Sequence, residues 1–175
     1  MLSLSDLPKL KEKAASGDLN ANFRLGKLYL DGILVKRSPE EAFKRFTIGA
    51  EANHSDSQGW LAWCFRKGLG VEPSGKKAFE WSQKSAEQGN SFGEYNLGRC
   101  YADGLGVERS LEEAVKWFRS SAEKGDGYGQ QALGYCYHYG QGVEKSITEA
   151  IKLFKKSAEQ ENPLGQFNFG FCYHY

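Results

Sequence analysis

The sequence predicts an all-α protein, a right-handed α/α solenoid (superhelix) built from antiparallel helix pairs. Three observations lead to this class: a 36-residue repeat, apolar residues at helical spacing within each repeat, and glycines that recur where helices are expected to end. Shifting the 175-residue chain by 36 positions aligns five large apolar residues, Leu25, Leu61, Leu97, Leu133 and Phe169. Such a register indicates stacked supersecondary units, each packing on its neighbours.

The first helix of each unit is predicted from the residues around this aligned position. Ala21, Leu28 and Tyr29 lie at i−4, i+3 and i+4 from Leu25, which places all four on one helix face. Gly32 follows, and glycine readily adopts the left-handed conformation that ends a helix. Equivalent glycines stand at Gly68, Gly104 and Gly140.

The second helix is predicted to begin at a serine. Ser38, Ser110 and Ser146 are each followed three residues later by Glu, the pattern of an N-cap with a capping box, and Pro39 suits a first helical position. The second unit, "EPSGKKA", lacks the box. The helix is expected to end near "AEQG" or "AEKG", at Gly89 and Gly125.

These units predict one solenoid domain over the whole chain. Its expected parts are an N-terminal capping helix (1–17), repeats 18–53, 54–89, 90–125 and 126–161, and a partial repeat (162–175). The partial repeat is rich in aromatic residues where a terminal repeat would be polar. We therefore expect either a longer array, or a partner or second copy that covers this end by end-to-end self-association.

Composition excludes several classes of function. Lys and Arg number 23 against 22 Asp and Glu, a formal net charge of +1, so nucleic acid is not an expected partner. The chain has no apolar run long enough to span a bilayer and no signal-peptide pattern at its start. We expect a cytoplasmic protein with no membrane insertion.

The repeat columns resemble the Sel-1-like repeat family, a relative of the tetratricopeptide repeat. The resemblance rests on "LGRCYADGLGVERSLEEAVKWFRSSAEKG" and its counterparts, and covers roughly residues 18–175. It implies a solenoid that acts as an adaptor or scaffold without enzymatic activity, with the first helices lining a concave surface. Departures are Ala62 for a first-helix glycine, Leu34 for a loop glycine, and the missing capping box, which affect only local loop geometry.

Four cysteines occupy one column: Cys64, Cys100, Cys136 and Cys172. Disulfide-rich members of the family carry a second cysteine within the unit, which is absent here. Stacked helices lie about 8–10 Å apart, whereas bridged cysteines need Cα atoms within roughly 7 Å. We predict reduced, buried thiols and no metal site or cofactor.

Two other patterns resemble parts of catalytic or nucleotide-binding sites. The stretch Gly70 to Lys77, "GVEPSGKK", fits part of a phosphate-binding loop but lacks the following Ser or Thr and a preceding strand, so an inter-helix loop is expected. His54, His138 and His174 have no nucleophile placed by spacing to serve them, so solvent or groove histidines are expected. The sequence therefore predicts no enzyme.

The face of the first helix opposite its core stripe is the candidate site. Helical geometry places positions 20, 23, 27, 30 and 31, and their equivalents, within about 60° of that face's centre. A solvated face would be polar, but this one is rich in aromatic and basic residues, which are typical of binding hot spots. The predicted groove residues are Phe23, Lys27, Trp63, Arg66, Phe92, Tyr95, Arg99, Tyr128, Gln131, Tyr135, His138, Tyr139, Phe167, Phe171 and His174.

The predicted function is a non-enzymatic scaffold or adaptor that binds a peptide or protein segment in this aromatic and basic concave groove. Two alternatives stay open: a purely structural or regulatory segment of a longer scaffold, or an enzyme with an unrecognised site. Burial of some of the rings between units is the alternative for the groove itself.

Overall fold

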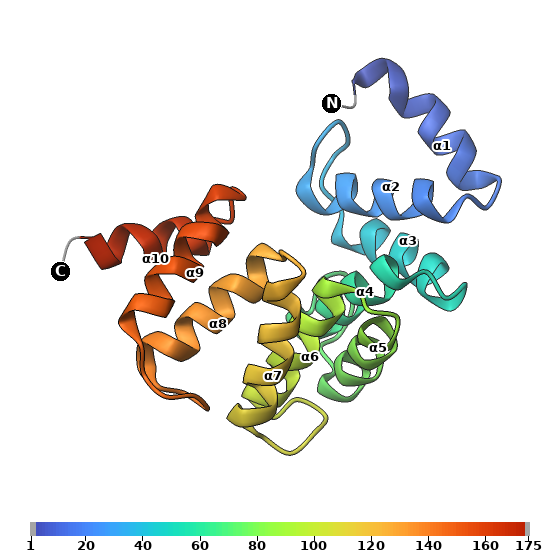
Figure 1. The fold of residues 1–175 in the computed structure, drawn as a ribbon. Coiled ribbons are helices and arrows are strands. Elements are labelled where there is room, and N and C mark those ends of the chain that lie inside the picture. The colour runs from blue at the N-terminus through green and yellow to red at the C-terminus, as the bar shows by residue number, and fades with distance from the viewer. Residues whose placement is uncertain (1–2, 174–175) are drawn as a thin grey trace.

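The computed structural model describes residues 3–173, and the side chains of residues 3–170. Within this range the chain forms helices only: a short 3₁₀ helix at Leu4–Asp6 and ten α-helices (Figure 1). The predicted all-α solenoid of antiparallel helix pairs is confirmed. The α-helices are α1 (Leu7–Ala15), α2 (Leu19–Asp31), α3 (Pro39–Glu51), α4 (Ser55–Lys67), α5 (Gly75–Glu87), α6 (Ser91–Asp103), α7 (Leu111–Glu123), α8 (Gly127–Tyr139), α9 (Ile147–Glu159) and α10 (Pro163–Tyr173).

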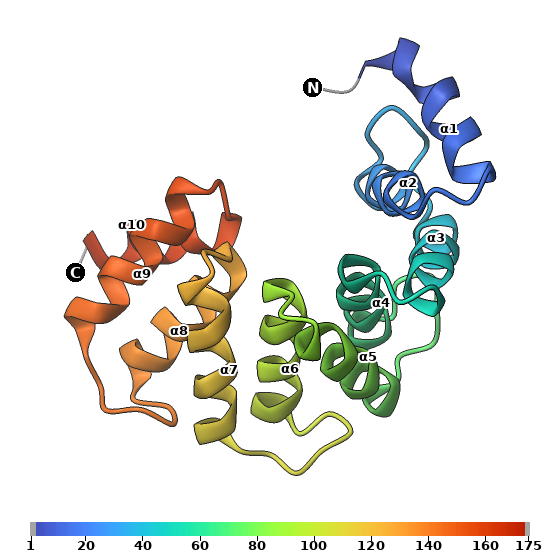
Figure 2. The ribbon, with the colours of Figure 1, turned by 45° about the vertical axis from the view of Figure 1, so that its right-hand side comes forward.

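The units follow one another along an arc, and the first and last units stand on either side of its open side (Figures 1 and 2). The first helices of successive units pack directly on one another, α4 on α6, α6 on α8 and α8 on α10. The second helices pack on the first helix of their own unit and on that of the next. The first helices therefore form the inner layer of the arc and the second helices the outer layer.

Each unit has its core between its two helices. The second helix contributes a fully buried alanine, such as Ala114, and usually a buried phenylalanine, such as Phe118. The first helix contributes the aligned leucine, and Leu97 is 2% exposed. The small alanine lets the two helices approach closely, so the apolar stripes predicted from spacing meet in one core.

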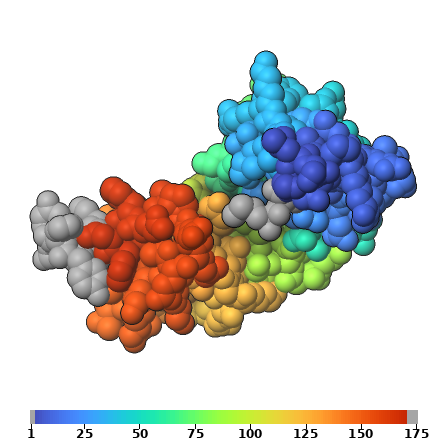
Figure 3. Space-filling model, turned by 90° about the horizontal axis from the view of Figure 1, so that it is seen from above, coloured from blue at the N-terminus to red at the C-terminus, as the bar shows by residue number. Residues whose placement is uncertain are grey.

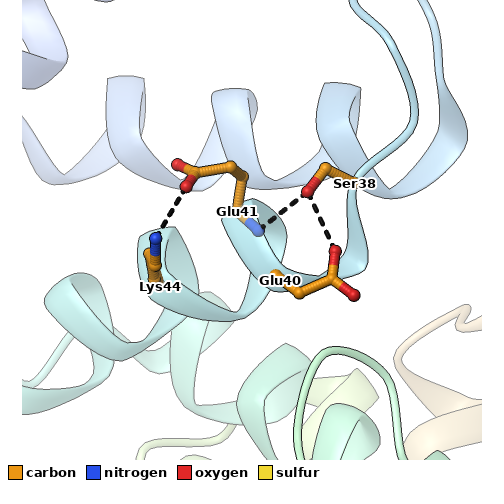
Figure 4. A network of polar contacts seen from close by, with 4 residues as sticks. All are labelled: Ser38, Glu40, Glu41 and Lys44. Atoms are coloured by element: carbon orange, nitrogen blue, oxygen red, sulfur yellow. Dashed lines mark hydrogen bonds and ion pairs between the residues drawn. The ribbon is translucent and has the colours of Figure 1, made fainter.

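The serine N-caps are confirmed, but the predicted capping box is only half formed (Figure 4). The Ser38 hydroxyl accepts the backbone N–H of Glu41 at 3.3 Å, as predicted. The Ser38 N–H, which the Glu41 carboxylate was expected to accept, instead donates to the carbonyl of Tyr29 at 2.8 Å. The Glu41 carboxylate pairs with Lys44 at 2.8 Å, and Glu40 accepts from the Ser38 hydroxyl at 3.0 Å. The same two backbone bonds recur at Ser110 and Ser146.

The first helices also have side-chain N-caps, which the sequence reading missed. Asp18, His54, Asn90 and Asp126 each accept a backbone N–H three residues later. His54 was expected to be a solvent or groove histidine, but its Nδ1 is the cap of α4. Three of the four residues in this column are Asp or Asn, the usual N-cap residues, so the column itself carried the signal.

The loop after the first helix keeps one backbone path in spite of a sequence change. The loop glycines Gly70, Gly106 and Gly142 have φ of 69°, 74° and 67°, in the left-handed region. Leu34, which replaces a loop glycine, has φ 63°. The substitution therefore leaves the left-handed turn in place, at the steric cost that a side chain incurs there.

Candidate binding groove

The predicted groove residues within 3–173 lie on the first helices, which form the inner layer of the arc. Seen from above, the N-terminal and C-terminal units lie at opposite ends of the molecule with the middle units between them (Figure 3). Along this inner layer the predicted residues fall into two groups. Those of the first three units pack largely between units, and those of the later units include exposed rings.

The rings of the middle units pack against one another across unit boundaries. Trp60 stacks on Phe92 with ring centroids 4.6 Å apart, and Trp63 lies edge-on to Trp60 at 5.2 Å. Tyr128 lies 5.5 Å from both Phe92 and Tyr95. Phe92 and Tyr95 are only 9% and 7% exposed. The neighbouring first helices therefore cover most of the face of Phe92 and Tyr95 that an isolated helix would expose.

The first unit contributes side chains that pack on the second. Phe23 is half-buried, and its ring lies 5.7 Å from that of His54. The ammonium of Lys27 lies 3.4 Å from the centroid of the Trp60 ring, a cation–π contact, and 3.9 Å from the carboxylate of Asp31. Burial lowers the pKa of Lys27, and Asp31 opposes this shift. Lys27 of the first unit thus packs on Trp60 of the second unit, on the inner layer of helices.

The last units present the accessible part of the predicted stripe. Tyr135 is 42% exposed and Tyr139 is 55% exposed, with their rings 4.5 Å apart. His138 is half-buried, 4.6 Å from the Tyr139 ring, and Phe167 of α10 is largely exposed. Exposed aromatic groups that neighbour one another are typical of interaction surfaces. Of the remaining predicted residues, Phe171 and His174 lie outside the described side chains.

A pocket of about 450 Å³ is lined mainly by residues of α4, α6 and α8, with further residues from α7 and from α10, among them Leu164. Five predicted groove residues line it: Arg66, Tyr95, Arg99, Gln131 and Tyr135. Arg109 and Gln141, from the loops after α6 and α8, also line it and were missed. A signal for Arg109 existed, because Arg37 and Lys145 are basic at the equivalent positions.

The pocket carries an excess of positive charge. Its charged lining consists of Arg66, Lys67, Arg99 and Arg109 against the single carboxylate of Asp103. Arg99 donates to both oxygens of Asp103, at 2.8 and 3.2 Å. The charge of Arg66, aided by burial and by Arg99, lowers the pKa of Lys67. The positive charges of the pocket lining therefore outnumber its single negative charge, and the pocket favours an anion over a cation.

Arg109 is held by the backbone of the helix it follows. Its Nε donates to the carbonyl of Ala102 at 2.9 Å, and Arg37 makes the equivalent bond to Leu30 at 3.1 Å. An arginine in this column thus satisfies a carbonyl at the end of the first helix. The same bond fixes the guanidinium of Arg109 at the edge of the pocket.

The cysteines have the predicted packing role where they are described. Cys64, Cys100 and Cys136 are free and buried, which confirms the prediction for these three, and the side chain of Cys172 is outside the described set. Burial raises the pKa of Cys64 to about 12, and that of Cys100 and Cys136 to about 11. Such thiols remain protonated and poorly nucleophilic at neutral pH.

The phosphate-loop-like stretch forms the expected inter-helix loop as far as Ser74, the N-cap of α5, and its last three residues, 75–77, begin that helix. The ammonium of Lys77 lies 5.2 Å from the centroid of the Phe65 ring. Among the side chains that the structure describes, no three His, Cys, Asp or Glu residues gather in a way that could hold a metal ion. None of the helices in the described part of the chain is long and apolar enough to cross a membrane.

Helix pairs that stack on one another along an arc (Figure 2) define a helical repeat solenoid. A family model described as "Sel1 repeat" matches residues 19–54, 55–90, 91–126 and 127–162. The chain belongs to the Sel1 repeat family, as its repeat columns predicted. Sel1-repeat proteins are generally non-catalytic scaffolds that mediate protein–protein interactions.

Solved structures agree with this assignment. The chain is 38% identical to c5321, a protective antigen of uropathogenic Escherichia coli strains with an SLR fold, with a TM-score of 0.67 over 93% of this chain and 35% of that one. It is 29% identical to a Sel1 repeat protein from Oxalobacter formigenes, with a TM-score of 0.76 over 89% of this chain and 62% of that one. Helicobacter pylori cysteine rich protein B shares the fold, at 23% identity and a TM-score of 0.56 over 75% of this chain and 94% of that one.

The chain spans only part of the first two relatives, 35% of one and 62% of the other. No curated protein sequence matches it.

Proposed function

We propose that this chain is a non-enzymatic interaction module that binds a segment of a partner protein along its inner layer of helices. The observation that carries the proposal is the juxtaposition of exposed Tyr135 and Tyr139 on α8 with the basic pocket between α4, α6 and α8. Tyrosine and arginine are the side chains that most often dominate binding energy at protein interfaces.

Rigid presentation is the proposed mechanism. The backbones of α4, α6 and α8 are fixed by direct packing on one another, so the groups they carry are held in place before a partner arrives. Binding then requires little ordering of the module, and the loss of conformational entropy falls mainly on the bound segment. The rings packed between units, such as Phe92, support this arrangement by holding the helices together.

The test is a selection of random displayed peptides on the whole chain, followed by titration of the selected peptides against variants. Replacing Tyr135 and Tyr139 with Ala removes two exposed rings, so folding should persist while binding weakens about thirty-fold or more. Ile48→Ala is the matched control, because Ile48 is an exposed apolar residue of the outer helix α3. Peptides that bind both variants equally well would contradict the proposal.

The exposed side chains of α10 support a second proposal, that this end contacts another copy of the chain. Leu164 and Phe167 are both more than half exposed. Sedimentation equilibrium should then detect dimers of the chain, and Phe167→Glu should return them to monomers. A chain that is monomeric at high concentration would rule out this contact.

A further inference from the structure

The basic pocket is lined by two arginines, each of which has guanidinium nitrogens that are buried and have no hydrogen-bond partner in the described part of the chain. Nε and Nη2 of Arg66 have no hydrogen-bond partner among the described residues, and neither does Nε of Arg99. Nη2 of Arg99 donates a hydrogen bond to the carboxylate of Asp103, so this nitrogen of the guanidinium already has a partner. The guanidinium of Arg66 makes only a cation–π contact with Tyr95, in which its central carbon lies 5.8 Å from the ring centroid. This contact is weaker than the hydrogen bonds that the group lacks.

Such an arrangement is costly without an acceptor. A buried N–H that has lost its water must regain a hydrogen bond, and the requirement is greater when the group is charged. Lys67, next to Arg66, adds a further ammonium to the pocket lining. The lowered pKa of Lys67, caused first by Arg66, shows that neighbouring positive charge is not cancelled by Asp103. An anion placed here would relieve the repulsion and accept the free N–H groups.

The lining indicates what kind of anion fits. A volume of about 450 Å³ lies within the range of sites for small ligands or a few residues of peptide. Tyr135 and Gln131 of α8 supply an aromatic face and an amide beside the basic groups. Asp103 remains in the lining, and its charge disfavours a dianion more than a monoanion. Carboxylate is the monoanion that a guanidinium fork matches through two parallel hydrogen bonds.

We propose that the pocket lined by Arg66, Lys67 and Arg99 binds a carboxylate of the partner segment, either an Asp or Glu side chain or a C-terminal carboxylate. This inference rests on the proposed function, because it names the chemical group that the groove recognises. On binding, the Arg66 side chain turns so that its unpaired N–H groups donate to the carboxylate, Lys67 contributes charge, and Tyr135 contacts the apolar part of the same segment. An acidic residue in the partner thereby sets the register of the segment along the groove.

The test uses small probes of defined charge on the whole chain. The arginine Nε–H resonances are followed by NMR while three peptides are added: acetyl-Gly-Glu-Gly-amide, its Gln counterpart, and acetyl-Gly-Gly-Gly with a free carboxyl terminus. We expect saturable shifts of the Arg66 and Arg99 signals with at least one of the two carboxylate peptides and none with the Gln peptide. Comparison of the two carboxylate peptides identifies the source of the group. Equal shifts with the Gln peptide would overturn the proposal.

Variants assign the response to the pocket. Arg66→Gln should weaken binding of the effective carboxylate peptide about tenfold or more, because hydrogen bonds to a charged group are lost. Lys155→Gln, which removes one charge from an exposed position on α9 outside the pocket, should leave it unchanged. If Arg66→Gln unfolds the chain, Lys67→Gln gives the same comparison. Unchanged affinity in a folded pocket variant would refute the assignment.

Two further outcomes separate this inference from the proposed function. Saturable binding of methyl phosphate without binding of either carboxylate peptide would overturn the choice of carboxylate. If selected peptides bind through Tyr135 and Tyr139 but tolerate Arg66→Gln and removal of their acidic residues, the groove stands and the carboxylate pocket fails. If the carboxylate probes bind but no displayed peptide is selected, the pocket stands as an anion site and the proposed peptide groove fails.

Discussion

Replacing Gly98 with Ala should destabilise the protein, whereas the same change at Gly170 should not. The two glycines occupy one repeat column, one residue after the aligned Leu or Phe. At Gly98 an added Cβ would lie 2.6 Å from two ring carbons of Phe118 and 3.1 Å from the carbonyl oxygen of Ala114. At Gly170 it would meet no described atom within 4 Å.

The magnitude follows from the packing around Phe118. Carbon atoms make favourable contact at about 3.5–4 Å, so the ring would have to move by roughly 1 Å within a packed core. Overpacking of this kind costs about 1–3 kcal/mol, and Ala regains about 0.5–1 kcal/mol over Gly within a helix. Two contacts at 2.6 Å place Gly98 in the upper half of the overpacking range, at about 2–3 kcal/mol, so the net loss is about 1–2.5 kcal/mol, or a melting temperature lowered by roughly 2–10 °C. Gly170→Ala should leave the melting temperature unchanged or slightly higher.

The assay is thermal and urea unfolding followed by far-ultraviolet circular dichroism. A double-mutant cycle with Phe118→Leu tests the cause, because the shorter side chain makes room for the new methyl group. The combined loss should be smaller than the sum of the two single losses by at least about 0.5 kcal/mol. Equal melting temperatures for Gly98→Ala and Gly170→Ala, or strict additivity with Phe118→Leu, would refute the reasoning.

Three other predictions concern local features. Ser110→Ala should lower the free energy of unfolding by about 1 kcal/mol, because the hydroxyl accepts the Glu113 N–H at 3.2 Å. Glu113→Ala should have a smaller effect, because the Ser110 N–H already donates to the carbonyl of Tyr101, and an equal loss in urea unfolding would mean that a full capping box forms. Leu34→Gly should raise the unfolding midpoint, because the left-handed φ of 63° is unstrained for glycine, and a lowered midpoint would contradict this. Burial raises the pKa of Cys64 from 9.0 to about 12, so between these values the native state keeps a proton that the unfolded state has lost, and stability falls as pH rises. The free energy of unfolding should therefore drop by about 1.4 kcal/mol more between pH 8 and pH 10 in the wild type than in Cys64→Ala, and equal drops would refute the assignment.

Features that depend on near neighbours along the chain were predictable. Helix pairs follow from apolar residues three and four positions apart, and their ends follow from residues such as Ser110 and Gly104. These signals are local, because a helix is closed by hydrogen bonds between residues four apart and its ends are satisfied within a turn. The burial of the cysteines was also predictable, because the 36-residue spacing places Cys64 and Cys100 at the same position of successive first helices.

Features that depend on contacts beyond a single helix were not predictable in the same way. The backbone N–H of Ser38 donates to the carbonyl of Tyr29, a residue of the preceding helix. The carboxylate of Glu41 therefore does not accept that N–H, and the capping box is not completed. Phe92 and Tyr95 lie on the face opposite the core stripe, as calculated, yet the adjacent first helices bury them.

The sequence by itself determined the repeat, the helix pair within each unit, the helix ends and the residues that face inward, because each rests on spacing along one chain. Only the tertiary structure decided which inward residues stay accessible, since the curvature of the stack sets how closely neighbouring first helices approach. The stacking of the helices buries most of the surface of Phe92 and Tyr95, and leaves the rings of Tyr135 and Tyr139 exposed to solvent. It also brings Arg66, Arg99 and the loop residue Arg109 to one pocket, because their approach depends on the packing of separate units.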